Sequence, residues 1–339
     1  MKNIFLLIFI LFSFKCNNEI ASSNLSVGFW NVENLFDLID DPDKRDEEFA
    51  LNGRKNVTQE IYDLKIKNSA EVLSDLDVDV LGLCEVENKN VLNDLNDVIE
   101  DKEYKIIHYE SPDERGIDNA LLYDPKKFKV ISSKPIRNIL GGDDKTRDIL
   151  YVEGTFNRNL IHIFVNHWPS NYGGKEKSIP KRNFTSKLLL GEIQKIKKAE
   201  VDPNIVLLGD FNEDPDDKNV LLLESAGLTN LMIGMIDKED LSTYIYRGNN
   251  YLYDQIIVSN SILDEKGFTL ADSTAYILDL PKYRQQKGKY KNYPFRFWAG
   301  NKLLGGYSDH LAVKVKSQWV VEAASSHSLN SQKLLGLPW

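Results

Sequence analysis

Cysteine is scarce in this chain of 339 residues, which contains two, Cys16 and Cys84. Because Cys16 lies in the first segment, no disulfide framework is possible in the rest of the chain. Cys84 follows Leu83 in an expected buried strand, so we interpret its thiol as an ordinary core side chain. Histidine is also rare, with five residues, and no Cys/His cluster has the spacing of zinc ligands. A site for a soft metal is therefore not expected.

Apolar runs long enough to span a membrane are missing as well. The run Ile4–Phe12 is too short to span, and with Lys2 before it the pattern is typical of a secretory leader. We predict that residues 1–20 are a signal peptide or lipoprotein leader, and that the protein is exported: secreted, periplasmic or a surface lipoprotein of a bacterium. Cys16 resembles the acylated residue of a bacterial lipoprotein, although Lys15 departs from the small residue normally found there. Membrane attachment through a lipidated Cys16 stays an open alternative.

Positive charge is in deficit, with 42 Lys and Arg against 51 Asp and Glu and a net charge of −9. This balance argues against a protein that coats nucleic acid through bulk electrostatics. The region from Pro281 to Ser308 differs, because it contains no acidic residue and alternates basic with aromatic side chains. A second basic cluster follows position 167 and comprises Lys175, Lys177, Lys181 and Arg182. Either region is interpreted as a rim that receives phosphates or as a solvated surface loop.

The pattern of apolar residues predicts both strands and helices. The expected strands lie near 25–30, 78–83, 104–108, 119–123, 127–132, 149–156, 160–166, 204–209, 253–259 and 310–316. The expected helices lie near 58–76, 88–100, 181–199 and 217–226. This mixture favours an α/β sandwich, in which two sheets pack face to face with helices outside. We predict one domain over residues 21–317, and we treat residues 318–339 as a disordered tail or an artificial addition.

Polar side chains occur at the ends of several of these strands. The run Ile205–Leu208 is followed by Gly-Asp-Phe-Asn, which places a carboxylate on Asp210 and an amide on Asn212 at one edge of a sheet. Functional residues are often found at such edges. Further strand ends of this kind carry Asn31, Glu85, Asn166, His167, Asp309 and His310.

Three of these residues predict a metal site. A hard divalent cation such as Mg²⁺ takes oxygen ligands, usually one or two carboxylates together with water and substrate phosphate. Asn31, Glu85 and Asp309 supply such a set. Each residue alone also has an ordinary structural interpretation: Asn31 as an Asn in a turn, Glu85 as a Glu at a helix start and Asp309 as an Asp that caps a strand. Their repeated placement at strand ends favours the metal site.

Two histidines at strand ends are candidates for proton transfer or for contact with a phosphate oxygen, namely His167 and His310. An imidazole in this role usually needs an acidic partner that fixes its tautomer. Asp118 and Asp254 are the candidate partners. The remaining histidines are interpreted as structural or peripheral; they are His108, His162 and His327.

Seven motifs together resemble the endonuclease/exonuclease/phosphatase superfamily, the fold of pancreatic deoxyribonuclease, exonuclease III and bacterial sphingomyelinase. In chain order they are WNVEN, LCEVEN, DNALLYD, NHWPS, GDFN, YDQIIVS and GGYSDH, and they span about residues 25 to 316. One tetrapeptide would carry little information, whereas seven in the right order are specific. The likeness is greatest to secreted endonuclease-like members. The implied fold is the deoxyribonuclease I-like αββα sandwich of four layers, with two mainly antiparallel sheets inside and helices outside.

The resemblance also implies a role for each candidate residue. Asn31 and Glu85 would hold the divalent metal, with Asp309 contributing from the opposite side. Asp210 would orient or deprotonate the attacking water, and Asn212 would hold the phosphate in the transition state.

The resemblance implies two catalytic imidazoles. His167 would contact the scissile phosphate with Asp118 behind it, and His310 would be the second imidazole, oriented by Asp254. Members of the superfamily differ over the general base, so this role is left open between the aspartate at position 210 and the imidazole at position 310. Arg115, near Asp118, is an additional candidate for a phosphate contact.

The implied activity is the Mg²⁺-dependent hydrolysis of phosphodiesters by in-line attack of water, with Mn²⁺ or Ca²⁺ as alternative metals. Export favours external nucleic acid, DNA or RNA, and thus an endonuclease. One alternative is a phospholipid phosphodiesterase of the sphingomyelinase type, in which Trp298 and Phe297 would dip into a membrane interface. Others are a phosphatase on small phosphoesters and a catalytically silent binding protein. We expect a monomer, because no segment resembles an association helix.

Overall fold

The computed structural model describes residues 24–141, 144–238, 240–264, 267–271 and 275–320. The expected leader at 1–20, including Cys16, lies outside the described residues, as does the tail from residue 321 onward. Strand β17 continues to Val320, so the domain extends past the expected limit of 317. No helix in the described ranges combines the length and the apolarity that crossing a membrane requires.

One of the two large sheets has seven strands in the order β13-β17-β1-β2-β4-β3, with β14 also paired to β17. Its strands are β1 (Asn24–Leu35), β2 (Val80–Val86), β3 (Lys105–His108), β4 (Asp118–Tyr123), β13 (Gly267–Leu270), β14 (Tyr276–Ile277) and β17 (Val313–Val320). Strands β1 and β2 are parallel, and the other pairs of this sheet are antiparallel. The carboxyl ends of β1 and β2 therefore meet at the same sheet edge.

The second sheet has six strands in the order β5-β6-β7-β8-β12-β9. Its strands are β5 (Lys129–Ile136), β6 (Ile149–Phe156), β7 (Asn159–His167), β8 (Asn204–Asp210), β9 (Leu228–Asn230) and β12 (Asp254–Ser259). Here β7 and β8 are parallel, whereas β12 runs antiparallel to β8. The end of β8 consequently lies beside the start of β12.

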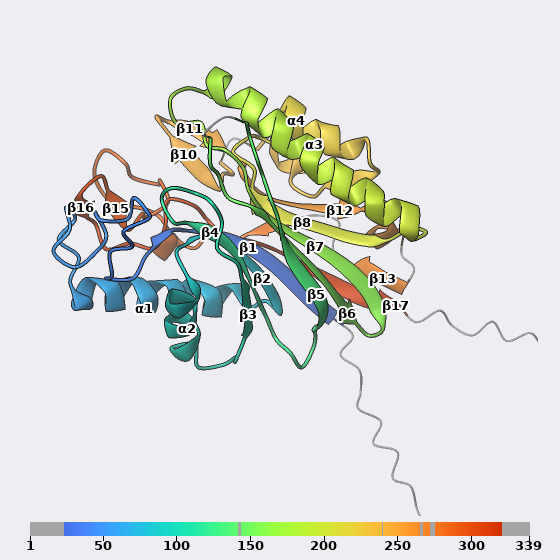
Figure 1. Ribbon diagram of the computed structural model, residues 1–339, viewed down its shortest axis with the longest axis horizontal. Helices are drawn as coiled ribbons and strands as arrows, with labels where there is room; N and C mark the ends of the chain where they lie inside the picture. The colour runs from blue at the N-terminus through green and yellow to red at the C-terminus, as the bar shows by residue number, and fades with distance from the viewer. Residues whose placement is uncertain (1–23, 142–143, 239, 265–266, 272–274, 321–339) are drawn as a thin grey trace, which may run out of the picture.

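Helices cover the outer faces of both sheets (Figure 1). Helices α1 (Gln59–Leu76) and α2 (Lys89–Asp97) lie on the side of the first sheet, and α3 (Lys175–Ala199) and α4 (Lys218–Glu224) lie on the side of the second. The side chain of Thr58 caps α1 and that of Asn88 caps α2 by accepting backbone N–H groups that the first turn leaves unpaired. The four-layer αββα sandwich with mainly antiparallel sheets is therefore confirmed.

The two sheets pack against each other through apolar side chains. A Cβ atom added to Gly82 of β2 would lie 3.1 Å from Val165 Cγ1 and 3.3 Å from Leu208 Cδ1, which are carried by β7 and β8. The core cluster includes side chains from both sheets, and Cys84 is fully buried within it. Its interpretation as a core thiol is confirmed.

The sequence pattern misses or misplaces several elements. Helix α3 begins at Lys175 rather than near 181, so Pro180 lies inside the helix, past the four N–H groups that have no intrahelical partner, and removes one backbone hydrogen bond. A hairpin of β10 (Tyr244–Tyr246) and β11 (Asn249–Tyr251) is also new. The other unexpected elements are the strands β9, β13 and β14 of the two large sheets, together with β15 (Trp298–Ala299), β16 (Lys302–Leu303), η1 (Ile233–Met235), η2 (Asn260–Ile262) and η3 (Pro281–Tyr283). Elements this short carry too little periodicity to be distinguished from loops.

Candidate active site

The register of the second sheet aligns three candidate residues side by side. His167 at the end of β7 is opposite Asp210 at the end of β8, and Asp210 is opposite Asp254 at the start of β12. The close approach of β7 and β8 explains the glycine of the GDFN motif, because a Cβ on Gly209 would lie 2.6 Å from Cβ of Asn166. The parallel strands β7 and β8 and the antiparallel strand β12 thus bring these three residues, which are distant in the sequence, to one edge of the second sheet.

A hydrogen bond joins this row to the first sheet. Asn31 Nδ2 on β1 donates to Asp210 Oδ2 at 3.1 Å, and both side chains are buried. Asn31 is opposite Cys84 in the register of β1 and β2, which places it next to Glu85. The edges of the two sheets therefore form one site.

His310 is held between two aspartates. Its Nδ1 lies 2.7 Å from Asp254 Oδ2, and its Nε2 lies 3.9 Å from Asp210 Oδ2. Burial of the ring opposes its charge, but the carboxylates of Asp254 and Asp210 outweigh burial and raise the pKa of His310 to about 10. His310 is therefore an imidazolium at neutral pH. Burial raises the pKa of Asp210 to about 7, so that this carboxyl titrates near neutrality.

His167 has the opposite electrostatic character. Burial, assisted by the positive charges of Arg147 and Arg115, holds the pKa of His167 well below its usual range. Its Nε2 lies 3.7 Å from Asp210 Oδ2 and 3.8 Å from Glu85 Oε1, which is too far for hydrogen bonds. Its Nδ1 is buried without a hydrogen-bond partner among the described residues. The ring is neutral and directed at two carboxylates.

The expected pairing of Asp118 with His167 is not found. Asp118 Oδ2 instead lies 3.0 Å from Nε2 of His108, and Asp118 Oδ1 accepts the backbone N–H of Ser111 at 2.8 Å. Strands β3 and β4 form an antiparallel pair in which His108 is opposite Ala120. Asp118 lies two residues before Ala120 on the same strand and is therefore close to His108. His108, which the sequence analysis interpreted as structural or peripheral, is thus the partner of Asp118. Arg115 has a side chain that is 45% exposed and lies 3.6 Å from Asp113 Oδ1.

Asn212 closes the turn that follows β8. Its backbone N–H donates to Asp210 Oδ1 at 2.9 Å, and its Nδ2 donates to the carbonyl of Trp168 at 3.2 Å. Its backbone is left-handed, with φ of 51°, and that of Glu85 is also left-handed, with φ of 62°. Left-handed backbone at a residue other than glycine costs about 1–3 kcal/mol and clusters at functional sites.

Asp309 belongs to a charged network that the sequence did not predict. Its Oδ2 accepts from Nη2 of Arg296 at 2.8 Å, and Arg296 Nε donates to Glu33 at 3.3 Å. The buried carboxylate of Glu33 also accepts the backbone N–H groups of Phe297 and Trp298. Burial and then the carboxylate of Asp309 raise the pKa of Glu33 to about 7. Glu33 therefore ties the segment near residue 297 to the site.

The donor set fits a hard divalent cation, because Asn31, Glu85 and Asp309 offer an amide and two carboxylates. Burial lowers the pKa of Lys65 to about 8 against the opposing charges of Glu33, Asp309 and Glu85. The Nζ of Lys65 itself donates to the backbone carbonyls of Val32 and Tyr307. A separate group of possible ligand atoms within 4.8 Å of one another comprises His108, Glu110 and Asp118. We favour the first set as the metal site, because Asn31 is hydrogen-bonded to Asp210, which lies beside His167 and His310.

Sequence reasoning missed Arg147 and Tyr244 at the site. Arg147 is buried, and its Nη2 donates to the carbonyl of Trp168 at 2.8 Å. Arg147 could have been predicted, because it precedes β6, and the start of this strand lies beside the end of its antiparallel partner β7. Tyr244 stacks on His310 with ring centroids 4.6 Å apart. No local pattern marks Tyr244, since it lies in a mostly exposed hairpin.

The basic cluster after position 167 does not form the expected open rim. Arg182 is fully buried and donates to Glu213 at 2.8 Å. Lys175 is paired with Asp217, and Lys181 is paired with Asp144. Most of this positive charge is therefore neutralised within the fold.

The sequence matches a family described as the Endonuclease/Exonuclease/phosphatase family over residues 26–318. The chain belongs to this family. Its members are metal-dependent phosphodiesterases and nucleases, so the chain is a hydrolase of this general type. No curated protein matched the sequence.

Several solved structures share the fold. Humanized D. rerio TDP2 is 18% identical, with a TM-score of 0.56, and the alignment covers 88% of this chain and 100% of that one. The human Nocturnin catalytic domain is 17% identical with a TM-score of 0.55, covering 88% and 95%. An endonuclease/exonuclease/phosphatase family protein from Bacteroides thetaiotaomicron is 17% identical with a TM-score of 0.55, covering 88% and 99%. At such identities the likeness establishes the fold alone.

Proposed function

We propose that this protein is an exported phosphodiesterase that depends on a divalent metal, Mg²⁺ in the first place, and cleaves nucleic acid internally. The observation that carries the proposal is the position of Asp210. Its carboxylate accepts from Asn31 of the opposite sheet at 3.1 Å and lies 3.9 Å from the Nε2 atom of His310. The carboxylate of Asp210 is thus next to a candidate metal ligand, Asn31, and to the charged imidazole of His310.

The two pKa shifts support a division of roles between Asp210 and His310. A general base works best with a pKa near the operating pH, and the pKa of Asp210 is raised by burial to about 7. His310 carries its proton at neutral pH and cannot accept another. We therefore assign the water-activating role to Asp210, and to His310 the stabilisation of negative charge that builds on the phosphate oxygens and the leaving group.

The neighbouring groups would bind the phosphate. His167 is neutral and buried beside Asp210, so its ring offers a single N–H donor to a phosphate oxygen. Asn212 and the half-exposed Arg115 are the further phosphate contacts of this proposal. A divalent metal held by Asn31, Glu85 and Asp309 would supply Lewis-acid charge at the same oxygens.

Nucleic acid is favoured over lipid because of the burial of two aromatic side chains. The lipid alternative requires Trp298 and Phe297 to enter a membrane interface, but their exposed fractions are 5% and 1%. Phe297 and Trp298 instead pack with each other against Phe36 and Phe49 in a small core cluster. One of the structures with this fold is D. rerio TDP2 complexed with single strand DNA product, which adds support. Export, with or without a lipid on Cys16, is the proposed location.

The test is an activity assay with matched metals and substrates. Purified protein is incubated with Mg²⁺, Mn²⁺ or Ca²⁺ and with plasmid DNA, RNA, sphingomyelin or a chromogenic phosphodiester, with and without chelator. We expect chelator-sensitive cleavage of nucleic acid and of the chromogenic ester, and loss of both in Asp210→Asn. Release of choline phosphate without nuclease activity would favour the lipid alternative. Inactivity on every substrate would favour a silent binding protein.

A further inference from the structure

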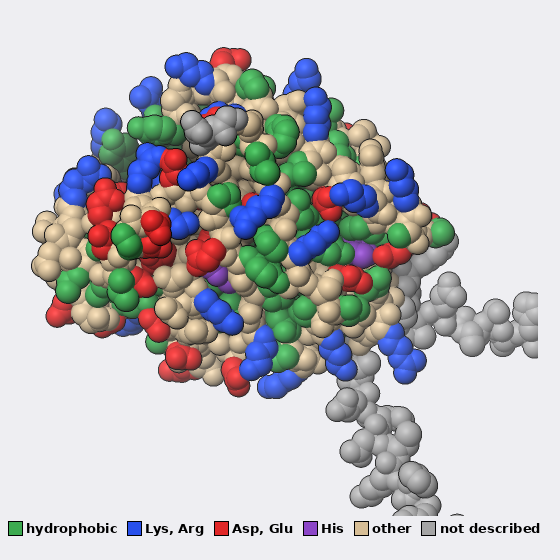
Figure 2. Space-filling model, viewed as in Figure 1, with side chains coloured by type: hydrophobic (Ala, Val, Ile, Leu, Met, Phe, Trp, Pro, Cys, Tyr) green, Lys and Arg blue, Asp and Glu red, His purple; other side chains and the backbone are tan. Residues whose placement is uncertain are grey.

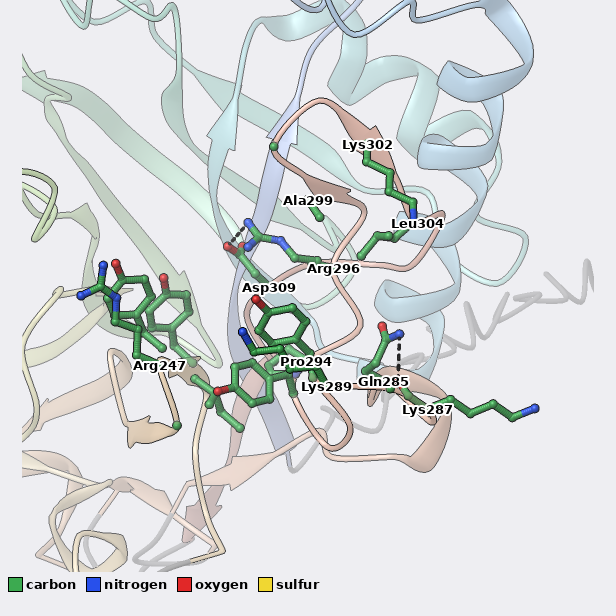
Figure 3. Close-up of a pocket in the computed structure, with 18 residues that line it drawn as sticks. Arg247, Gln285, Lys287, Lys289, Pro294, Arg296, Ala299, Lys302, Leu304 and Asp309 are labelled. Carbon is green, nitrogen blue, oxygen red and sulfur yellow. Dashed lines mark hydrogen bonds and ion pairs between the residues drawn. The ribbon is translucent and has the colours of Figure 1, made fainter.

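A pocket of about 940 Å³ adjoins the candidate active site. It lies between the β10–β11 hairpin and the segment from 285 to 304, and Asp309 lines it. Figure 3 shows Arg247 on one side and Lys302 with Leu304 on the other, with the ion pair of Arg296 and Asp309 between them. The pocket therefore opens directly beside a candidate metal ligand.

Exposed aromatic rings form part of the lining. Tyr244 stacks on His310, and it also lies nearly parallel to Tyr246, with centroids 6.5 Å apart and 8° between the planes. Tyr246 is 49% exposed, and across the pocket Tyr290 is 55% exposed. Tyrosine rings thus line the pocket from the side next to His310 to its solvent-exposed side.

Basic side chains accompany these rings. The guanidinium of Arg247 lies 5.2 Å from the ring centre of Tyr246, and the ammonium of Lys289 lies 5.3 Å from that of Tyr290. The acidic lining residue, Asp309, is paired with Arg296. Figure 2 shows Lys and Arg side chains over the part of the surface where the β10–β11 hairpin lies. The pocket is thus locally positive although the chain is acidic overall.

This combination matches the chemistry of a nucleotide. Tyrosine rings stack on bases of any sequence, and basic side chains follow the phosphates of the strand. The volume is within the range of about 300–1,000 Å³ that is usual for small-ligand pockets. A base inside a double helix is stacked and paired, so it could enter only after being extruded. The pocket is therefore suited to an unpaired base.

We propose that this pocket binds an unpaired nucleobase next to the phosphodiester that is cleaved, and that the protein therefore prefers single-stranded nucleic acid to duplex. The proposal rests on the function proposed above and adds its substrate class. The base stacks on Tyr246 or Tyr290, while Arg247 and Lys289 contact the neighbouring phosphates. A lipid fits the pocket less well, because its exposed rings are tyrosines flanked by cations rather than an apolar surface.

The first test changes the protein. In the Asp210→Asn background, binding of fluorescently labelled single-stranded DNA and RNA is measured by anisotropy for the double variant Tyr246→Ala/Tyr290→Ala. The matched control is Tyr276→Ala, which removes a similarly exposed tyrosine (51%) on β14, outside the pocket lining. Stacking on one base is worth about 1–3 kcal/mol, so we expect a Kd at least about 5-fold higher for the double variant and unchanged for the control.

The second test changes the substrate and needs no variant. The unaltered protein should bind a single-stranded oligonucleotide better than the same strand with abasic sites and better than a duplex. Rates on a small chromogenic phosphodiester should be equal in the unaltered protein and in the Tyr276→Ala control, because residue 276 lies outside the pocket lining.

Two results would overturn the inference: equal binding of intact and abasic strands, or a double variant that binds as well as the Tyr276→Ala control. If the chromogenic ester is still hydrolysed in either case, the proposed function stands and only the pocket assignment fails. Absence of hydrolysis on all substrates would overturn the proposed function, while the anisotropy measurement would still decide whether the pocket holds a base. DNA and RNA arms distinguish the two sources of the base.

Discussion

The Nδ1 atom of His310 lies 2.7 Å from Oδ2 of Asp254, and both side chains are buried. This pairing fixes the orientation of the ring and leaves Nε2 directed toward Asp210 at 3.9 Å. The resemblance in the sequence implied the partnership of His310 with Asp254, and the structure brings the two residues together. The catalytic role of the pair stays a prediction.

Replacement of Asp254 should change the pH dependence of catalysis. The carboxylates of Asp254 and Asp210 outweigh burial and raise the pKa of His310 from 6.5 to about 10, so the imidazolium persists through neutral pH. In Asp254→Asn the pKa of His310 should fall, and the alkaline limb of the kcat profile should move to lower pH. An unchanged alkaline limb in the folded variant would show that His310 does not act as an imidazolium.

The same shift predicts a dependence of stability on pH. A histidine whose pKa is raised by folding stabilises the folded state fully below its unfolded pKa, near 6.5. This contribution is lost as the pH rises from there through about 10. In denaturant titrations the difference in unfolding free energy between the unaltered protein and Asp254→Asn should therefore shrink over this interval. A difference that is constant from pH 6 to pH 10 would contradict the assignment.

The metal site predicts a specific effect of Glu85. In Glu85→Gln the carboxylate becomes an amide, so the Mg²⁺ concentration that gives half the maximal rate should rise at least about tenfold. Glu47→Gln, which alters an exposed acidic residue, is the matched control and should leave the metal requirement unchanged. If the two variants require the same Mg²⁺ concentration, Glu85 is not a ligand.

The partnership of Asp118 with His108 can be tested by a double-mutant cycle. Residues that share a buried hydrogen bond should show a coupling energy of about 0.5–3 kcal/mol in the free energy of unfolding. We expect such coupling between Asp118→Asn and His108→Ala, whose side chains are 3.0 Å apart. A parallel cycle with His167→Ala should be additive. Coupling of Asp118 to His167 but not to His108 would support the pairing that the sequence suggested.

Glu33 should be important for stability as well as for the site. Glu33→Ala leaves the buried backbone N–H groups of Phe297 and Trp298 without their acceptor, and each such group costs about 1–3 kcal/mol. We expect the free energy of unfolding to fall by about 2–5 kcal/mol, with Glu47→Ala as a control that changes little. Equal stability of the two variants in denaturant titrations would show that Glu33 does not hold this segment.

The strand ends could be predicted from the sequence because their signal is local. An apolar run that stops at a polar side chain identifies Asp210 or Glu85 without knowledge of the rest of the fold. The register that aligns His167, Asp210 and Asp254 then follows from strand direction. Long stretches with clear periodicity, such as α1, were predicted for the same reason.

The remaining parts of the site depend on contacts between distant segments. Glu33 is identified only by its hydrogen bonds to residues near 297, far along the chain. Tyr244 gains its place beside His310 through a β-bridge that joins a short hairpin to another segment. The pairing of Asp118 with His108 was accessible in principle, because β3 and β4 form a local hairpin whose ends meet.

Asp210 lies at the centre of the proposed metal-dependent phosphodiesterase site, where the edges of both sheets meet. The most direct measurement is the rate of hydrolysis of a chromogenic phosphodiester, with Mg²⁺ and with chelator, by the unaltered protein and by Asp210→Asn. We predict activity that requires Mg²⁺ and falls by about 10²–10⁴-fold in the variant, while circular dichroism is unchanged. Activity that survives chelation would exclude the metal requirement, and a folded Asp210→Asn protein with an unaltered rate would exclude Asp210 from catalysis.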